Sequence, residues 1–390
     1  MGTSVSLCNR HGFWCSSLGR RDSDGAGEAK EYELNLVIHA PNIHTGGGRT
    51  LLLALLRALK QPAVVQLDER FGPMPVLARN VEVIRVAPSL RARLQAERRL
   101  KSLCRNGEVL LCFANLPPLF HSSARTFVYL QNRYLTSSRP LTGLQWSARL
   151  RIRIERLWLR YRLHNATLLV QTETMLQEVR ENFGCEATVL PFLPDLPQLS
   201  SRYLPLRYDY LYVASGEPHK NHRRLLQAWI LLANRGFRPS LCLTLDAQRD
   251  AALLLCVEES VRKYGLRVFN NSLPPEHTLG LYMQCGALVY PSLFESFGLP
   301  LLEAWKAGLP IIASGRDYVE DVIVPTISFD PESPISIARA ILRHKGLKEE
   351  PSLPGNPTEF LDFLNQKYKL RVNSLKKLTT TTCKYILCVF

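Results

Sequence analysis

Two glutamates, Glu295 and Glu303, stand eight positions apart in a basic chain, on either side of a glycine and a proline. Glu295 follows the apolar run ALVYPS, which predicts a buried strand, and Glu303 lies in the first turn of a helix predicted to begin at Pro300. The free N–H groups of a helix N-terminus bind phosphates, and carboxylates accept hydrogen bonds from hydroxyls. The segment therefore suits a ligand with both features, such as a nucleotide sugar.

Taken as isolated residues, the two glutamates favour a simpler interpretation: an exposed loop residue, and a helix residue stabilised by the helix dipole. The longer segment PSLFESFGLPLLEAWKAGLPIIAS changes this, because it resembles the E-x7-E segment of retaining glycosyltransferases of the GT-B fold, particularly glycosyltransferase family 4. The segment YDYLYVASGEPHKNHRRLLQAW resembles the part of that family that opens the second domain. The resemblance is strong over about residues 208–330, weaker over 34–193 and absent from both ends.

The resemblance implies that this loop holds the donor. It assigns Glu295 to the transferred sugar and Glu303 to the ribose. Lys220 in SGEPHKN, close to Gly216, matches the lysine that the family places on the donor diphosphate, and we expect it to act with Glu295 in catalysis. The arginine that usually accompanies this lysine is missing. Backbone groups near the sugar and phosphates are expected to come from Ser296, Phe297, Gly298 and Leu299.

In the first half of the chain, TGGGRT matches the glycine turn that approaches phosphates or acceptor in such enzymes. On their own, these glycines indicate only a tight turn. Arg49, just beyond them, is a candidate for the leaving phosphate. Many relatives carry a histidine or an acid where this chain has Gln131 and Asn132, and an amide can position an acceptor hydroxyl but cannot act as a general base. The three candidate glycines are Gly46, Gly47 and Gly48.

No metal or cofactor is expected, because the charge on the leaving diphosphate can be met by Lys220, Arg49 and helix-terminal amides. The D-x-D motif at Asp22 and Asp24 lies in the polar N-terminal stretch, with no strand before it. Ten cysteines show no C-x-x-C spacing. His219 and His222 stand three apart without further ligands, and we interpret them as polar surface.

Strand-like and helix-like runs alternate through most of the 390 residues, which predicts parallel sheets covered by helices on both faces. We predict an α/β chain of the GT-B type, with two Rossmann-like domains facing each other across a cleft. The predicted parts are a disordered tail over 1–32, an acceptor domain over 33–193, a proline-rich linker over 194–207, a donor-binding domain over 208–346, and a C-terminal helix with an irregular tail over 347–390.

The net charge of +15 favours anionic partners. Residues 145–164 predict a basic amphipathic helix, and two interpretations are open: it lies on an anionic membrane, or it packs on the sheet with a solvated basic face. Nucleic acid is not expected, because no platform of interleaved basic and aromatic residues is present. No apolar run is long enough to span a membrane. The arginines of the predicted basic face are Arg149, Arg153, Arg156 and Arg160.

The sequence thus predicts a metal-independent retaining glycosyltransferase. It would move a hexose, mannose by resemblance, from a nucleotide-diphosphate sugar to a glycan or lipid-linked acceptor, in the cytoplasm or at the inner face of the membrane. Two alternatives remain. A nucleotide-sugar epimerase of the same fold would act on the donor without an acceptor. A non-catalytic glycosyltransferase-like protein is compatible with the missing arginine.

Overall fold

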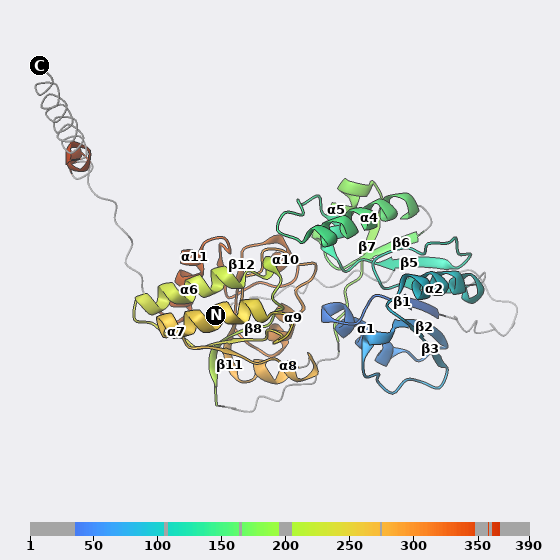
Figure 1. Cartoon of the computed structure of the whole chain (residues 1–390), viewed down its shortest axis with the longest axis horizontal. Coiled ribbons are helices and arrows are strands. Elements are labelled where there is room, and N and C mark those ends of the chain that lie inside the picture. Colours follow the sequence, from blue (N-terminus) through green and yellow to red (C-terminus); the bar gives the residue numbers. More distant parts are fainter. Residues whose placement is uncertain are drawn as a thin grey trace, which may run out of the picture.

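A computed structural model of the chain describes residues 36–104, 108–163, 166–194, 205–273, 275–347, 358 and 361–366. The predicted N-terminal tail lies outside the described residues, as do most of the proline-rich linker and most of the C-terminal segment. Figure 1 shows the described part as two α/β domains side by side.

The first domain is built on a seven-stranded sheet in the order β3-β2-β1-β4-β5-β6-β7, and every pair of neighbouring strands is parallel. Its strands are β1 (Leu36–Ala40), β2 (Ala63–Asp68), β3 (Val81–Val86), β4 (Val109–Cys112), β5 (Arg125–Tyr129), β6 (Ala166–Val170) and β7 (Ala187–Val189). Its helices are α1 (Gly46–Ala58), η1 (Glu69–Phe71), α2 (Leu90–Leu103), α3 (Arg133–Thr136), α4 (Trp146–Arg162) and α5 (Glu173–Phe183).

The second domain carries a six-stranded parallel sheet in the order β10-β9-β8-β11-β12-β13. Its strands are β8 (Tyr208–Tyr212), β9 (Leu241–Leu243), β10 (Val268–Asn270), β11 (Cys285–Tyr290), β12 (Ile311–Ser314) and β13 (Ile327–Phe329). Its helices are η3 (Pro218–Lys220), α6 (His222–Asn234), α7 (Ala251–Tyr264), α8 (Pro275–Tyr282), α9 (Leu299–Lys306), α10 (Asp317–Glu320) and α11 (Pro334–His344).

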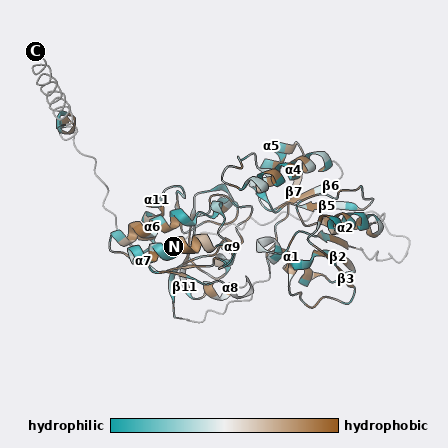
Figure 2. Ribbon diagram, viewed as in Figure 1, coloured by the Kyte–Doolittle hydropathy of each residue, from teal (hydrophilic) through white to brown (hydrophobic). Residues whose placement is uncertain are grey.

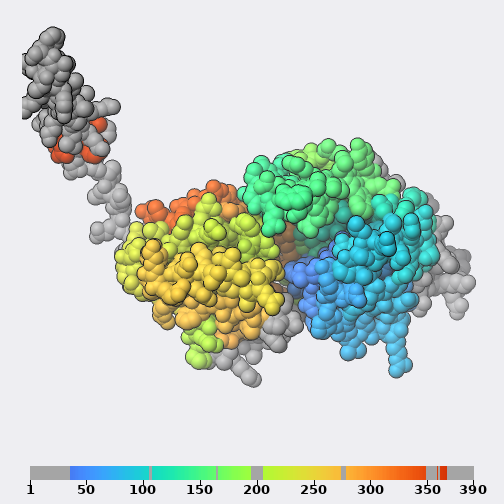
Figure 3. Space-filling view, in the orientation of Figure 1, coloured from blue at the N-terminus to red at the C-terminus, as the bar shows by residue number. Residues whose placement is uncertain are grey.

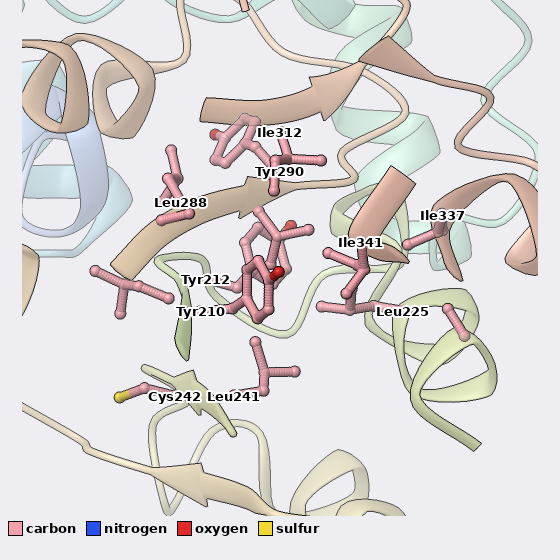
Figure 4. Packing of buried hydrophobic residues seen from close by; sticks show 14 of the residues in the cluster. Tyr210, Tyr212, Leu225, Leu241, Cys242, Leu288, Tyr290, Ile312, Ile337 and Ile341 are labelled. Carbon is pink, nitrogen blue, oxygen red and sulfur yellow. The ribbon is translucent and has the colours of Figure 1, made fainter. Parts of the chain in front are cut away.

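The hydrophobic core of the second domain is one continuous cluster, whereas that of the first domain falls into two clusters. In Figure 4, Leu225 of α6 and Ile341 of α11 lie over Tyr210 and Tyr212 of the central strand β8. Leu299, at the start of α9, belongs to the second domain but packs against one core cluster of the first. The two domains therefore meet at the beginning of α9, and Figure 3 shows the surface hollowed between them.

These two parallel-sheet domains confirm the predicted fold class. One local expectation needs correction: the glycine run of TGGGRT is not a turn that precedes a helix. The turn lies at residues 41–42 and a bend at 45, and the glycines form the first turn of α1, where Gly46 has φ +66°. No helix in the described ranges is long and apolar enough to cross a membrane.

Candidate functional site

Lys220 and Glu295 lie in direct contact at the carboxyl ends of the second sheet. Lys220 ends η3, which follows β8, and Glu295 lies in the loop between β11 and α9. The Lys220 ammonium donates to both carboxylate oxygens of Glu295, at 2.6 and 2.8 Å. Two further donors hold the same carboxylate: the hydroxyls of Ser292 at 2.6 Å and Tyr290 at 3.1 Å. Two predicted site residues, 75 positions apart, are thus brought to one point.

The electrostatics of this contact keep Glu295 ionised. Burial acts to raise the pKa of its carboxyl, but the Lys220 ammonium and the Ser292 hydroxyl outweigh it and hold the pKa below the usual value. The carboxylate is fixed by four hydrogen bonds, so it can present a negative charge at a defined position. A carboxylate held in this way suits a partly positive sugar carbon or a sugar hydroxyl.

Glu303 has a different environment, although it lies only eight positions after Glu295 in the sequence. It sits in α9, and its Oε2 accepts a hydrogen bond from the hydroxyl of Tyr282 at 2.7 Å. Burial raises the pKa of the Glu303 carboxyl, and the bond from Tyr282 only partly offsets this. No basic side chain is bonded to it among the described contacts. This carboxyl is suited to accept hydrogen bonds from neutral hydroxyls.

The N-terminus of α9 lies between the two glutamates. Gly298 is its N-cap, with φ +74°, and no side chain caps the helix. Pro300 has no N–H and the Leu301 N–H donates to the Gly298 carbonyl at 2.9 Å, so among the described contacts the Leu299 N–H is the group that this helix end offers to a ligand. A Cβ on Gly298 would come within 3.0 Å of Leu301, which explains why the position suits glycine. A Cβ on Gly47 would lie 3.3 Å from Leu299. The glycine start of α1 therefore faces the donor loop across the domain boundary.

Close packing also surrounds the other predicted glycine, Gly216. A Cβ there would lie 2.6 Å from a carboxylate oxygen of Asp250, so any larger residue would displace that side chain. Ser296 is half-buried and Phe297 is buried, with 7% of its surface exposed. The predicted donor-binding segment is therefore mostly enclosed.

The interpretation of the two histidines as polar surface is wrong. His222 is only 5% exposed, lies against Tyr212 with ring centroids 4.7 Å apart, and has no hydrogen-bond partner for either ring nitrogen among the described residues. Burial lowers its pKa to about 4, so the ring is neutral near pH 7. Burial also lowers the pKa of His219, whose ring meets Tyr134 of the first domain edge-on at 5.8 Å.

The first-domain candidates are bonded mainly within their own domain. Arg49 donates from Nε to the carbonyl of Phe71 at 2.9 Å and lies over that ring. Asn132 accepts the N–H of Tyr134 and so caps α3. Gln131 donates to a backbone carbonyl through Nε2, while its Oε1 is buried without a partner among the described residues and lies 3.3 Å from the Cβ position of Gly48. Gln131 thus has a free acceptor near the glycine start of α1.

The residues that support the two glutamates are not marked by any pattern in the sequence. Tyr282, Tyr290 and Ser292 hold the two glutamates, but an apolar strand or helix pattern gives a buried tyrosine hydroxyl no distinctive signal. Arg133, next to the predicted pair Gln131 and Asn132, proves to cross the domain boundary, where it meets the carbonyl of Glu295.

Within the described ranges, no group of three or more His, Cys, Asp or Glu side chains is arranged to hold a metal ion. The D-x-D motif at Asp22 and Asp24 lies outside those ranges. The absence of metal and cofactor therefore stays a prediction.

Part of the chain is similar in sequence to known glycosyltransferases. A family model described as "Glycosyl transferases group 1" matches residues 206–352. O-antigen chain mannosyltransferase B of Escherichia coli is 32% identical over 170 residues, which are 42% of this chain and 44% of that protein. Serotype-specific mannosyltransferase WbdA of Escherichia coli is 34% identical over 119 residues, 29% of this chain and 14% of that protein. The chain thus spans less than half the length of these relatives.

Solved structures are similar over most of the chain. Sucrose-phosphate synthase from Thermosynechococcus elongatus has a TM-score of 0.60 at 18% identity, covering 80% of this chain and 90% of that chain. HepE of Anabaena, solved with UDP and glucose, has a TM-score of 0.61 at 12% identity, covering 80% and 89%. The chain therefore has the GT-B fold of glycosyltransferases, and its second domain matches the glycosyl transferases group 1 family.

Proposed function

We propose that the chain is a retaining hexosyltransferase of the E-x7-E group in glycosyltransferase family 4, with a nucleotide-diphosphate hexose as donor. The contact between Lys220 and Glu295 carries this proposal, because it sets a cation and an anion side by side in the loop that leads into α9. The two mannosyltransferase relatives favour mannose as the hexose. The donor-binding residues are then those of the loop 295–299 together with Glu303.

In this mechanism the bond between the anomeric carbon and the diphosphate oxygen breaks, and a bond from the acceptor oxygen forms on the same face of the sugar. The acceptor proton passes to the departing phosphate oxygen. Lys220 and the Leu299 N–H at the start of α9 stabilise the charge that develops on the diphosphate. The Glu295 carboxylate faces the sugar, where positive charge builds up in the transition state. The ribose hydroxyls donate to Glu303. These residues supply the electrostatic stabilisation without a metal ion.

The acceptor in this proposal is a glycan or a lipid-linked sugar that enters from the first domain. Gln131 supports this placement, since its free Oε1 can accept a hydrogen bond from an acceptor hydroxyl. Arg49 stays a candidate for the leaving phosphate only if its side chain leaves the Phe71 carbonyl.

Thermal shift with a panel of nucleoside diphosphates and nucleotide sugars tests the donor site. We expect a rise in melting temperature with one base, the same for the diphosphate and its sugar conjugate, and no dependence on added Mg²⁺. Transfer is then measured with that donor and a polysaccharide or polyprenyl-linked acceptor mixture. Conversion of the donor to an isomer without acceptor would favour an epimerase. Nucleotide binding without either reaction would favour a non-catalytic protein.

We further propose that the chain works at an anionic membrane surface, through α4. Its core side is marked by the buried Ile152 and Leu159. The opposite side is an apolar stripe, and Figure 2 shows brown residues between teal ones along this helix. The stripe consists of Trp146, 77% exposed, Leu150, 50%, Ile154, 55%, Leu157, 54%, and Tyr161, 72%. Six arginines and one glutamate make up the charged residues of the helix, which favours an anionic surface over a protein partner.

The predicted arginine face contributes less than the sequence suggests. Arg149, Arg156 and Arg160 donate to backbone carbonyls of their own domain. Arg153 is exposed beside the apolar stripe, where its guanidinium can bind lipid phosphates. The apolar stripe, rather than the arginine face, is thus the main contact in this proposal.

Co-sedimentation with vesicles of phosphatidylglycerol and of phosphatidylcholine tests the membrane contact. We expect binding to the anionic vesicles only, and an approximately tenfold or larger loss in the double variant Ile154→Glu, Leu157→Glu. Leu255→Glu is the matched control, because Leu255 is 61% exposed on α7 of the second domain. Equal sedimentation of the parent and the double variant would overturn the membrane contact. If instead the parent associates with itself as its concentration rises and the double variant does not, the apolar stripe binds a second copy of the chain.

A further inference from the structure

Arg133 is a first-domain residue with an unusual set of partners. It is the first residue of α3 and only 6% exposed. Its guanidinium bonds Glu178 of α5, in its own domain, at 2.9 Å from Nε. Across the domain boundary it forms a two-pronged contact with Asp317 of α10, at 2.9 and 2.5 Å. One prong, Nη1, also lies 3.3 Å from the backbone carbonyl of Glu295.

The segment that carries Arg133 is fixed rigidly in the first domain. Glu178 accepts from Arg133 through one oxygen and from the Thr136 hydroxyl through the other, at 2.6 Å. Arg156 of α4 donates to the carbonyls of Tyr134 and Ser137, at 2.9 and 2.5 Å. Arg133 and its segment are therefore held by bonds within the first domain, in addition to their bonds to the second domain.

The same segment encloses the residue that precedes Glu295. The guanidinium groups of Arg133 and Arg139 lie 4.7 and 5.0 Å from the ring centroid of Phe294, and the Tyr134 ring lies at 4.8 Å. Arg139 also donates to the carbonyl of Leu293 at 3.2 Å. The backbone on both sides of Phe294 is thus bonded to the first domain, one bond at Leu293 and one at Glu295.

We infer that Arg133 is a positioning residue: it locks the backbone of the donor loop to the first domain, so that Glu295 reaches its working position only when the two domains are closed on each other. The inference rests on the proposed function of Glu295. Arg133 does not touch the Glu295 carboxylate, which is held by Lys220, Ser292 and Tyr290. It acts through the carbonyl of Glu295 and through Asp317, whose side chain is half-exposed at the boundary.

The charge state of the contact between Arg133 and Asp317 favours such a lock. The hydrogen bonds from Arg133 outweigh burial and lower the pKa of the Asp317 carboxyl, so the pair is fully charged at neutral pH. A bidentate arginine–carboxylate pair also fixes relative orientation as well as distance, because both partners are planar. A lysine at position 133 cannot reproduce this geometry.

A kinetic comparison of Asp317→Asn with Asp321→Asn tests the inference. Both residues lie at the same end of the boundary, and Asp321 accepts a bond from the Thr174 N–H of the first domain at 3.2 Å, but its contact does not involve the donor loop. We expect kcat for transfer to fall about tenfold in Asp317→Asn while the Kd for the nucleoside diphosphate stays within about twofold. We expect Arg133→Lys to behave in the same way, and Asp321→Asn to keep the parent kcat.

Hydrogen exchange of residues 293–297 gives a readout that does not depend on turnover. We expect faster exchange in Asp317→Asn and Arg133→Lys, and the parent rate in Asp321→Asn. An unchanged kcat in Asp317→Asn, or an equal fall in Asp321→Asn, would overturn the positioning role. An inactive parent protein would instead overturn the proposed function, and the exchange comparison would still decide whether the lock exists.

Discussion

The two domains share one architecture but use their polar residues differently. In the second domain, Lys220 and Glu295 bond to each other, and Glu295 and Glu303 also accept hydrogen bonds from nearby hydroxyls. In the first domain, the side chains of Arg49 and Asn132 are bonded to backbone groups of the same domain. In the function that we propose, the donor chemistry therefore lies in the second domain, and the first domain mainly positions the donor loop and the acceptor. Substitutions in the two domains should therefore have different kinetic signatures.

Glu295→Gln should have the largest effect. It keeps the shape of the side chain but removes the charge that faces the sugar and balances Lys220. We expect the transfer rate to fall by about 10²- to 10³-fold with the nucleotide affinity kept. Steady-state kinetics with Glu259→Gln, an exposed glutamate on α7, as control measures this. A variant with full activity would place catalysis elsewhere.

Lys220→Ala should weaken binding of the donor diphosphate. A hydrogen bond to a charged group contributes about 1.5–3 kcal/mol, which corresponds to roughly a 10- to 100-fold change in affinity. The Glu295 carboxylate would also lose its cation, so the melting temperature should fall. Calorimetry with the nucleoside diphosphate measures the affinity, with Lys306→Ala on α9 as control. Unchanged affinity would exclude Lys220 from the diphosphate site.

The opposite pKa shifts of the two glutamates predict a pH dependence. Because burial raises the pKa of Glu303 and the Lys220 pair lowers that of Glu295, falling pH protonates Glu303 first. Affinity for ribonucleotides should therefore decrease as the pH falls through the raised pKa, while Glu295 is still ionised. We expect up to about a tenfold loss, and no such loss for a 2′,3′-dideoxy nucleotide. If the affinities of the two nucleotides changed with pH in the same way, Glu303 would not contact the ribose hydroxyls.

Gln131→Ala should have the smallest effect and should act on the acceptor alone. Loss of one neutral hydrogen bond costs about 0.5–1.5 kcal/mol, so we expect the acceptor KM to rise by roughly 2- to 10-fold with the donor KM unchanged. Steady-state kinetics with each substrate varied in turn measures this. A change in the donor KM instead would show that the first domain also contributes to donor binding, and would weaken the contrast between the domains.

The sequence was most informative where the pattern is local. The apolar run ALVYPS predicted β11, and the glycine and proline that follow it predicted the start of α9, since these depend on neighbouring residues. Pairing Lys220 with Glu295 in one site depended on the family resemblance, because 75 positions separate the two residues and no local pattern connects them.

Features that depend on the packing of distant segments could not be predicted. Arg133 meets Asp317 across 184 positions, and no local pattern marks an arginine that bonds to another domain. His222 looked like a surface residue because the chain around it is polar, yet it is buried against the ring of Tyr212 of β8. On α4, the predicted helix is present, but its arginines do not form one solvated face. Arg149, Arg156 and Arg160 donate to backbone carbonyls that lie far from them in the sequence or in the preceding turn, and no local pattern marks those partners.

A crystal structure with the nucleoside diphosphate that gives the largest thermal shift tests the central claim most directly. We expect a diphosphate within hydrogen-bonding distance of the Lys220 ammonium and the Leu299 N–H at the start of α9, with the ribose hydroxyls on Glu303. A nucleotide bound away from both Lys220 and Glu303 would contradict it.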